Sequence, residues 1–211
     1  MKIALYGATG MIGQSILKEA LSRGHDVTAI ARDPSKLTPA DHLKIVKGDV
    51  LDTAGVAATV AGHDAVIAAV SNPPGDLEFY VKAAHSLIDA LTQAGVKRLI
   101  VVGGAGSLEV APGLKLYDTP DFPELWRPGA KSLGAALDTY RTSAGSLDWT
   151  FFSPAGMIAP GDRTGKFRIG GDQLLTDANG GSNISVDDYA IALVDELEQG
   201  KHIRQRFTVA Y

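Results

Sequence analysis

Three glycines near the start of the chain have the spacing of a phosphate-binding turn. In "KIALYGATGMIGQSILKEALSRG", Gly7, Gly10 and Gly13 follow an apolar run at regular intervals. In such a turn, the first glycine lets the chain reverse after a strand, the second leaves room for a pyrophosphate, and the third lets a helix pack on the strand. The free amides of Met11, Ile12 and Gly13 would then face the anion. The alternative is that these glycines serve packing alone.

Arg32 adds a second candidate anion contact. It ends the apolar run "DVTAIAR" and follows Ala31, where an acidic residue is expected if a free ribose 2'-hydroxyl is recognised. An arginine there suits a 2'-phosphate, which predicts NADP(H) in preference to NAD(H). The alternative is a solvated arginine paired with Asp33.

Other reactive groups are sparse. The chain has no cysteine, and its five histidines form no His-x-x-x-His pair, so we expect no metal site. Asp187 and Asp188 resemble a carboxylate pair, but the spacing of Ser185 and Asp188 favours a helix capping box. "GDRTGK" has one residue too few between its glycines to be a nucleoside triphosphate loop.

These residues must be positioned by alternating strands and helices. Hydrophobic periodicity predicts strands at 2–7, 26–32, 43–49, 64–71, 97–104, 147–154 and 206–210, and helices at 14–24, 53–62, 77–95, 130–143 and 186–199. We expect Pro128 to interrupt the helix that precedes residue 130. Apolar strands separated by helices predict one α/β domain over residues 1–211, a Rossmann fold with a doubly wound, mostly parallel sheet.

Two irregular segments rich in glycine and proline, 104–122 and 154–183, follow the carboxyl ends of predicted strands. Ligands bind at this edge of an open parallel sheet, so we predict that both segments are substrate loops. Phe122 and Trp126 are candidate lid residues over an aromatic substrate, with simple packing as the alternative.

Composition excludes several function classes. A formal net charge of −4 without a basic stripe argues against nucleic acid and anionic membrane as partners. No uncharged apolar stretch long enough for a membrane span and no signal-peptide pattern occurs. We therefore expect a cytoplasmic protein. Its expected partner is a small-molecule acceptor, and its expected state is a monomer or homodimer.

The stretch "YGATGMIGQSILKEALSRGHDVTAIARDPSKL" resembles the start of the atypical short-chain dehydrogenase/reductases. "KGDVLD", "AAVSN", "LDWTFFSPAGMIAPG" and "ISVDDYA" extend the resemblance over nearly the whole chain. "GGAGSL" and "GDQLLTDANG" narrow it to proteins described as NADH-flavin reductases, related to biliverdin reductase B and NmrA-like proteins.

The resemblance implies a contact for each part of a dinucleotide. The pyrophosphate would be held by Gly7, Thr9, Gly10, Met11, Ile12 and Gly13; the adenosine ribose by Arg32; the adenine by Asp49 and Val50; and the nicotinamide half by Val70, Ser71, Gly103 and Gly104.

The proton donor of the standard reductases is missing. Those enzymes carry a serine and then a tyrosine followed by a lysine four residues later, but no tyrosine here has that lysine. Ser107 is our catalytic candidate, with a loop-capping role as the alternative. Reducing a ketone requires an acid for the alkoxide, whereas a flavin accepts a hydride and can take its proton from water. We therefore predict an NAD(P)H-dependent oxidoreductase that reduces FMN, FAD or a similar conjugated acceptor.

Two alternatives stay open. The first is a non-catalytic NADP(H) sensor of the NmrA type, which signals through a protein partner. The second is a nucleotide-sugar epimerase, which is disfavoured because only about 60 residues follow the sixth predicted strand.

Overall fold

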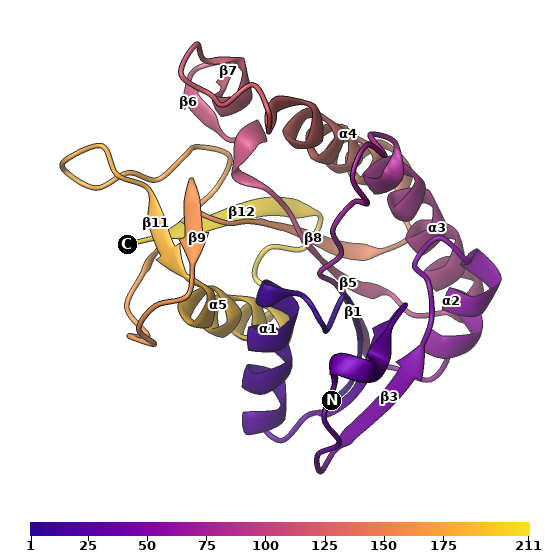
Figure 1. The fold of residues 1–211 in the computed structure, drawn as a ribbon. Coiled ribbons are helices and arrows are strands. Elements are labelled where there is room, and N and C mark those ends of the chain that lie inside the picture. The colour runs from indigo at the N-terminus through magenta and orange to yellow at the C-terminus, as the bar shows by residue number, and fades with distance from the viewer.

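A central eight-stranded sheet organises the chain, and the computed structural model describes all 211 residues (Figure 1). The strand order is β10-β12-β8-β5-β4-β1-β2-β3, and every neighbouring pair is parallel except β10 with β12. The strands are β1 Lys2–Tyr6, β2 Asp26–Ala31, β3 Leu43–Lys47, β4 Ala65–Ala68, β5 Arg98–Val102, β8 Asp148–Ser153, β10 Arg168–Gly170 and β12 Gln205–Ala210.

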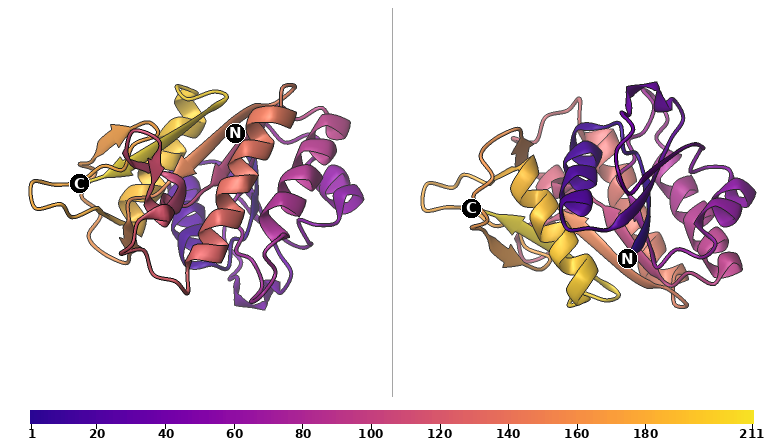
Figure 2. Two further views of the ribbon diagram at one scale, coloured as in Figure 1. Left: turned by 90° about the horizontal axis from the view of Figure 1, so that it is seen from above. Right: turned by 90° about the horizontal axis from the view of Figure 1, so that it is seen from below.

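Helices cover both faces of this sheet (Figure 2). α1 (Met11–Ser22) and α5 (Val186–Gln199) lie on one face, and α2 (Thr53–Val60), α3 (Phe79–Ala94) and α4 (Arg127–Ser143) lie on the other. Each face has its own hydrophobic core. The adjacent residues Phe151 and Phe152 of β8 belong to opposite cores because successive strand side chains point to opposite faces. The predicted single-domain Rossmann fold with a doubly wound, mostly parallel sheet is confirmed.

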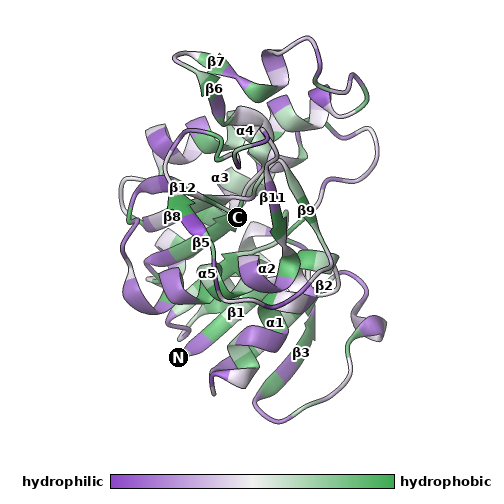
Figure 3. Cartoon of the chain, turned by 90° about the vertical axis from the view of Figure 1, so that its left-hand side faces the viewer, coloured by the Kyte–Doolittle hydropathy of each residue, from purple (hydrophilic) through white to green (hydrophobic).

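Hydropathy follows this layering. In Figure 3, hydrophobic colour is concentrated in the central strands, and hydrophilic colour lies on the outer helices and loops. No helix combines the length and the apolar character that crossing a membrane requires.

Helix ends show where local sequence signals were sufficient. α5 begins after Ser185, whose Oγ accepts from the Asp188 N–H at 3.0 Å, and it ends at Gly200 with a φ of +60°. The prediction that Pro128 interrupts a helix was wrong. Pro128 lies in the first turn of α4, where no backbone hydrogen bond is lost, so the helix runs on from Arg127.

The two predicted substrate loops contain short elements. Residues 104–122 hold the 3-10 turns η2 (Ala105–Ser107) and η3 (Leu116–Asp118) and a hairpin of β6 (Glu109–Ala111) and β7 (Leu114–Lys115). β9 (Met157–Ala159) and β11 (Asn183–Ser185) pair with each other, and a third turn, η1 (Pro34–Lys36), follows β2. Glu109 joins the loops, because its N–H donates to the Asp172 carbonyl and its carbonyl accepts from the Leu174 N–H, both at 2.9 Å.

Candidate functional site

The three glycines differ in what the protein requires of them. Gly7 has a φ of +81°, and a Cβ there would lie 2.1 Å from the Ala69 carbonyl oxygen. A Cβ on Gly13 would lie 2.1 Å from the Gly7 carbonyl oxygen. At Gly10, by contrast, the nearest atom to a built Cβ is 3.5 Å away, which is ordinary contact. Packing therefore explains Gly7 and Gly13, whereas the space beside Gly10 is left open by the protein.

The first turn of α1 has no protein acceptor for its amides. Gly10 is the N-cap residue and supplies no side-chain cap, and the N–H groups of Met11, Ile12 and Gly13 make no hydrogen bond within the chain. In α5, the cap position is instead filled by the Ser185 hydroxyl. Three free donors at the positive end of a helix form an anion-binding site.

A pocket of about 270 Å³, here called the glycine pocket, lies beside this turn. Its lining contains most of the predicted dinucleotide contacts, namely Gly7, Thr9, Gly10, Arg32, Asp49, Val50, Val70 and Ser71. Tyr6, Ile30 and Phe79 add apolar and aromatic surface to its wall. The pocket therefore combines apolar surface with the glycine turn.

Arg32 is exposed and forms no ion pair. The alternative partner, Asp33, instead accepts a hydrogen bond from the Ser35 N–H at 3.1 Å, and the Ser35 hydrogen bonds lower the pKa of Asp33. Lys36 lines the same pocket and also makes no ion pair. Two uncommitted cations therefore face the side of the glycine pocket that follows β2.

A larger cleft of about 960 Å³, here called the loop cleft, lies between the two predicted substrate loops. Gly104 and Ser107 of the first loop line it, as do Met157 and Ser182 of the second. The segments 72–77 and 123–126, together with the first turns of α3 and α4, complete its wall. Phe122 and Trp126, the candidate lid residues, also line it.

The two cavities adjoin at the end of β4. Val70 and Ser71 line the glycine pocket, and the next residue, Asn72, lines the loop cleft. A ligand that fills the glycine pocket can therefore present one end to the loop cleft. Gly103 lines neither cavity. Packing explains why this residue is a glycine, because a Cβ there would lie 2.2 Å from the Phe151 ring. Its contact with the nicotinamide half stays a prediction.

Ser107 is held by a buried arginine that the sequence analysis missed. Arg206 of β12 donates to the Ser107 hydroxyl oxygen at 3.0 Å and to the Ser107 carbonyl at 2.9 Å, and Asp172 pairs with the guanidinium. Burial lowers the pKa of Arg206, and Asp172 counteracts this shift. The Ser107 hydroxyl accepts the hydrogen bond from Arg206 and donates none within the chain, so its proton is available to a bound acceptor. The available sequence signal was one arginine in the apolar run of the closing strand.

The fold brings no tyrosine–lysine pair into the loop cleft. Lys131 lies over the face of the Tyr117 ring, 5.5 Å from its centroid, and pairs with Asp118. Tyr117 is not part of the loop-cleft lining. Tyr80 does line the cleft, but burial raises its pKa, which makes it a weaker acid. The only carboxyl in the cleft lining is that of Asp121, and the lining contains no lysine to form the tyrosine–lysine pair of the standard reductases.

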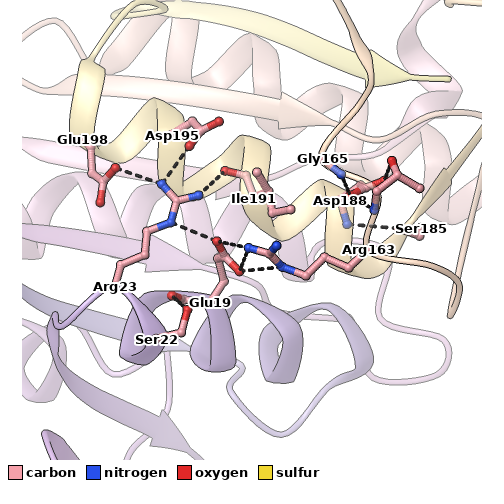
Figure 4. A network of polar contacts seen from close by, with 11 residues as sticks. Glu19, Ser22, Arg23, Arg163, Gly165, Ser185, Asp188, Ile191, Asp195 and Glu198 are labelled. Carbon is pink, nitrogen blue, oxygen red and sulfur yellow. Dashed lines mark hydrogen bonds and ion pairs between the residues drawn. The ribbon is translucent and has the colours of Figure 1, made fainter.

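The second loop is tied to the helix that follows the glycines (Figure 4). Glu19 of α1 is buried and accepts from both Arg23 and Arg163, each at about 3 Å. Asp188 of α5 accepts from the N–H groups of Thr164 and Gly165 at 2.9 and 2.8 Å. The amides of Thr164 and Gly165 in the "GDRTGK" segment are thus used within the protein, in agreement with its rejection as a phosphate loop.

The capping box at α5 is half formed. Ser185 caps the helix as predicted, but the Asp188 carboxylate binds residues 164 and 165 and the Tyr211 hydroxyl instead of the Ser185 N–H. Asp188 therefore fixes the second loop and is fully buried away from both cavities.

Comparison with known proteins agrees with this geometry. A model of the family described as NAD(P)H-binding matches residues 7–199. The curated protein YwnB of Bacillus subtilis, described as uncharacterized, is 45% identical over 99% of this chain and 98% of its own length.

Three solved structures each cover all of this chain. One from Burkholderia pseudomallei, provisionally described as an exported protein, is 49% identical with a TM-score of 0.92 over 100% of its length. One from Bacteroides thetaiotaomicron, provisionally described as an epimerase, is 46% identical with a TM-score of 0.93 over 96% of its length. One from Streptococcus pneumoniae, provisionally described as an NADH-flavin reductase, is 40% identical with a TM-score of 0.89 over 99% of its length. The resemblance to atypical short-chain dehydrogenase/reductases is confirmed, and this chain belongs to the NAD(P)H-binding family.

Proposed function

We propose that this protein is an NADPH-dependent reductase of flavins or similar conjugated acceptors. The observation that carries the proposal is the junction at residues 70–72, where the glycine pocket meets a largely apolar cleft that has one carboxyl, Asp121, and no lysine in its lining. The family match and the relative described as a flavin reductase support the same class.

The residues present fit a dinucleotide. The space beside Gly10 is open because no protein atom crowds it, and the three free amides of α1 border the same turn. These amides would hold the pyrophosphate, with Asp49 and Val50 beside the adenine and Val70 and Ser71 toward the nicotinamide.

A preference for NADPH is part of the proposal. Arg32 and Lys36 line the glycine pocket without ion pairs of their own, so neither must break a contact to bind a 2'-phosphate. Charge-assisted hydrogen bonds to such a phosphate favour NADPH over NADH.

The chemistry needs little acid catalysis from the protein. NADPH, an oxidised acceptor and one proton give NADP⁺ and the doubly reduced acceptor, and water can supply that proton. The protein's own contribution would be to orient the acceptor, to exclude bulk water from the cleft and, at Ser107, to donate a hydrogen bond.

A steady-state acceptor panel tests this proposal. NADPH consumption is expected with riboflavin, FMN, FAD or a quinone, and little or none with simple ketones. Brisk ketone reduction would reveal a proton donor that the proposal lacks. Tight NADPH binding without any turnover would favour the sensor, and turnover of a nucleotide sugar would favour the epimerase activity suggested by the Bacteroides relative's description.

We also propose that the protein works in the cytoplasm as a monomer or homodimer, because NADPH is maintained there as a free reductant. Cell fractionation and light scattering test these points. A protein found outside the cytoplasm would contradict the first, and the Burkholderia relative described as exported makes that measurement necessary.

A further inference from the structure

The loop cleft differs from the glycine pocket in the charges that line it. Asp121 is the only formally charged residue among the 24 that line the loop cleft. The glycine pocket has two cations, Arg32 and Lys36, and two acidic residues, Asp33 and Asp49, on its wall. A phosphate ester carries between one and two negative charges at neutral pH. The glycine pocket therefore offers cationic side chains to a phosphate, whereas no cationic side chain lines the loop cleft.

The cations around the loop cleft are engaged elsewhere. Arg127 donates to three carbonyl oxygens within residues 117–122. Lys131 pairs with Asp118 at 3.3 Å, and Lys115 lies over the Tyr117 ring, 5.6 Å from its centroid. Arg206 is 3% exposed and has its own carboxylate partner. A phosphate entering the cleft would therefore have to compete for cations that already have partners.

The remaining lining suits a flat, uncharged molecule. Tyr80, Leu133, Phe122 and Trp126 contribute aromatic or aliphatic surface from α3, α4 and the first loop. Trp126 is 57% exposed at the cleft, so its ring is accessible for stacking. Neutral hydrogen-bonding groups, including the Ser107 hydroxyl, can satisfy ring carbonyls or nitrogens without adding charge.

We propose that the loop cleft selects uncharged planar acceptors, such as a flavin without a phosphate or a quinone, over phosphorylated flavins. This inference rests on the proposed function, and the acceptor undergoes the same balanced two-electron reduction by NADPH. Its physical basis is electrostatic: a phosphate brought toward Asp121 meets a like charge, and no cation in the cleft lining offsets that repulsion.

Equilibrium binding of riboflavin and FMN tests the inference, because the two molecules differ only by one phosphate. Flavin fluorescence is titrated with the protein in the absence of NADPH. Riboflavin is expected to bind at least about fivefold more tightly than FMN at low ionic strength, with the ratio narrowing as salt screens the charges. Equal or tighter binding of FMN would overturn the inference, as would no measurable binding of riboflavin.

A pair of charge variants locates the effect. Asp121→Lys is expected to reverse the preference toward FMN, because it replaces the only charge of the cleft with a cation. Asp89→Lys makes the same change on the exposed side of α3, outside the cleft, and should leave the ratio unchanged. Equal ratios in the two variants would overturn the inference.

A second pair locates the binding site. Gly129 lines the cleft, and a Cβ there meets no atom within 4 Å, so Gly129→Leu should weaken both flavins at least about tenfold without disturbing the packing. Gly145 is equally open but lies outside the cleft, so Gly145→Leu is the control. Unchanged flavin binding in folded Gly129→Leu would place the flavin elsewhere and overturn the inference.

Failure of this inference can be distinguished experimentally from failure of the proposed function. If the proposed function fails, NADPH is not consumed with quinones or with any flavin. If this inference fails, the flavin titrations show it, and those contain no dinucleotide.

Discussion

Replacing Gly10 by valine separates cofactor binding from folding. Gly10 has a φ of −77°, which any residue can adopt, and its built Cβ is 3.5 Å from the nearest protein atom. The fold therefore tolerates the side chain, apart from about 1 kcal/mol for a poorer helix N-cap. A valine would nevertheless fill the space assigned to the pyrophosphate. Losing two charge-assisted hydrogen bonds to the α1 amides costs about 3–6 kcal/mol, so NADPH should bind at least about a hundredfold more weakly.

Gly13→Ala is the matched contrast. Its Cβ would lie 2.1 Å from the backbone oxygen of Gly7, which cannot move aside as a flexible side chain could. This variant should lose stability as well as affinity. Calorimetric titration with NADPH measures binding, and thermal unfolding measures stability. A folded Gly10→Val protein with unchanged NADPH affinity would refute the assignment and reduce the glycines to packing elements.

Three further variants test other parts of the account. Arg32→Ala should erase most of the preference for NADPH over NADH, a difference in binding free energy of about 1.5–3 kcal/mol. Lys18→Ala, on the exposed side of α1, should leave that preference unchanged. Equal affinities of the unmodified protein for NADPH and NADH would contradict this prediction. Ser107→Ala should lower kcat/KM for the acceptor about tenfold with NADPH affinity unchanged, while a loop-capping role predicts a lower Tm alone. Hydrogen bonds from residues 164, 165 and 211 outweigh the effect of burial and lower the pKa of Asp188. The stabilisation that the Asp188 carboxylate provides is therefore present above about pH 4 and is lost as pH falls through the lowered pKa. Asp188→Asn should lower the free energy of unfolding by about 2–3 kcal/mol at pH 7, measured with denaturant, and by progressively less in acid. A loss of stability that does not depend on pH would argue against an ionised Asp188.

The fold was predictable because its signals are local. Strands buried on both faces read as continuous apolar runs, and the bounds of α5 follow from Ser185 before it and Gly200 after it. Pro128 was misread because a proline that starts a helix and one that breaks it look alike in the sequence alone. Only the three-dimensional position of its missing N–H distinguishes the two cases.

Of the two cavities of the candidate site, only the glycine pocket was predictable from the sequence. The glycine pocket is built from turns that follow consecutive strands, so its lining could be predicted from motif spacing. The loop cleft depends on long-range contacts: Arg206 reaches Ser107 across 99 positions of sequence, and α4 supplies Ala130 and Leu133 as wall residues. No local sequence pattern predicts these contacts, because they depend on where β12 pairs in the sheet and where α4 packs against it.

The central claim is that NADPH in the glycine pocket reduces an acceptor in the loop cleft. Its most direct test is the anaerobic stoichiometry of NADPH oxidised to acceptor reduced, measured with a neutral quinone. We expect one NADPH oxidised per acceptor reduced in the unmodified protein, and slow turnover in Gly10→Val and in Gly129→Leu. The first variant should fail through NADPH affinity and the second through acceptor affinity. An unmodified protein that binds NADPH tightly yet leaves both the dinucleotide and every acceptor unchanged would contradict the account.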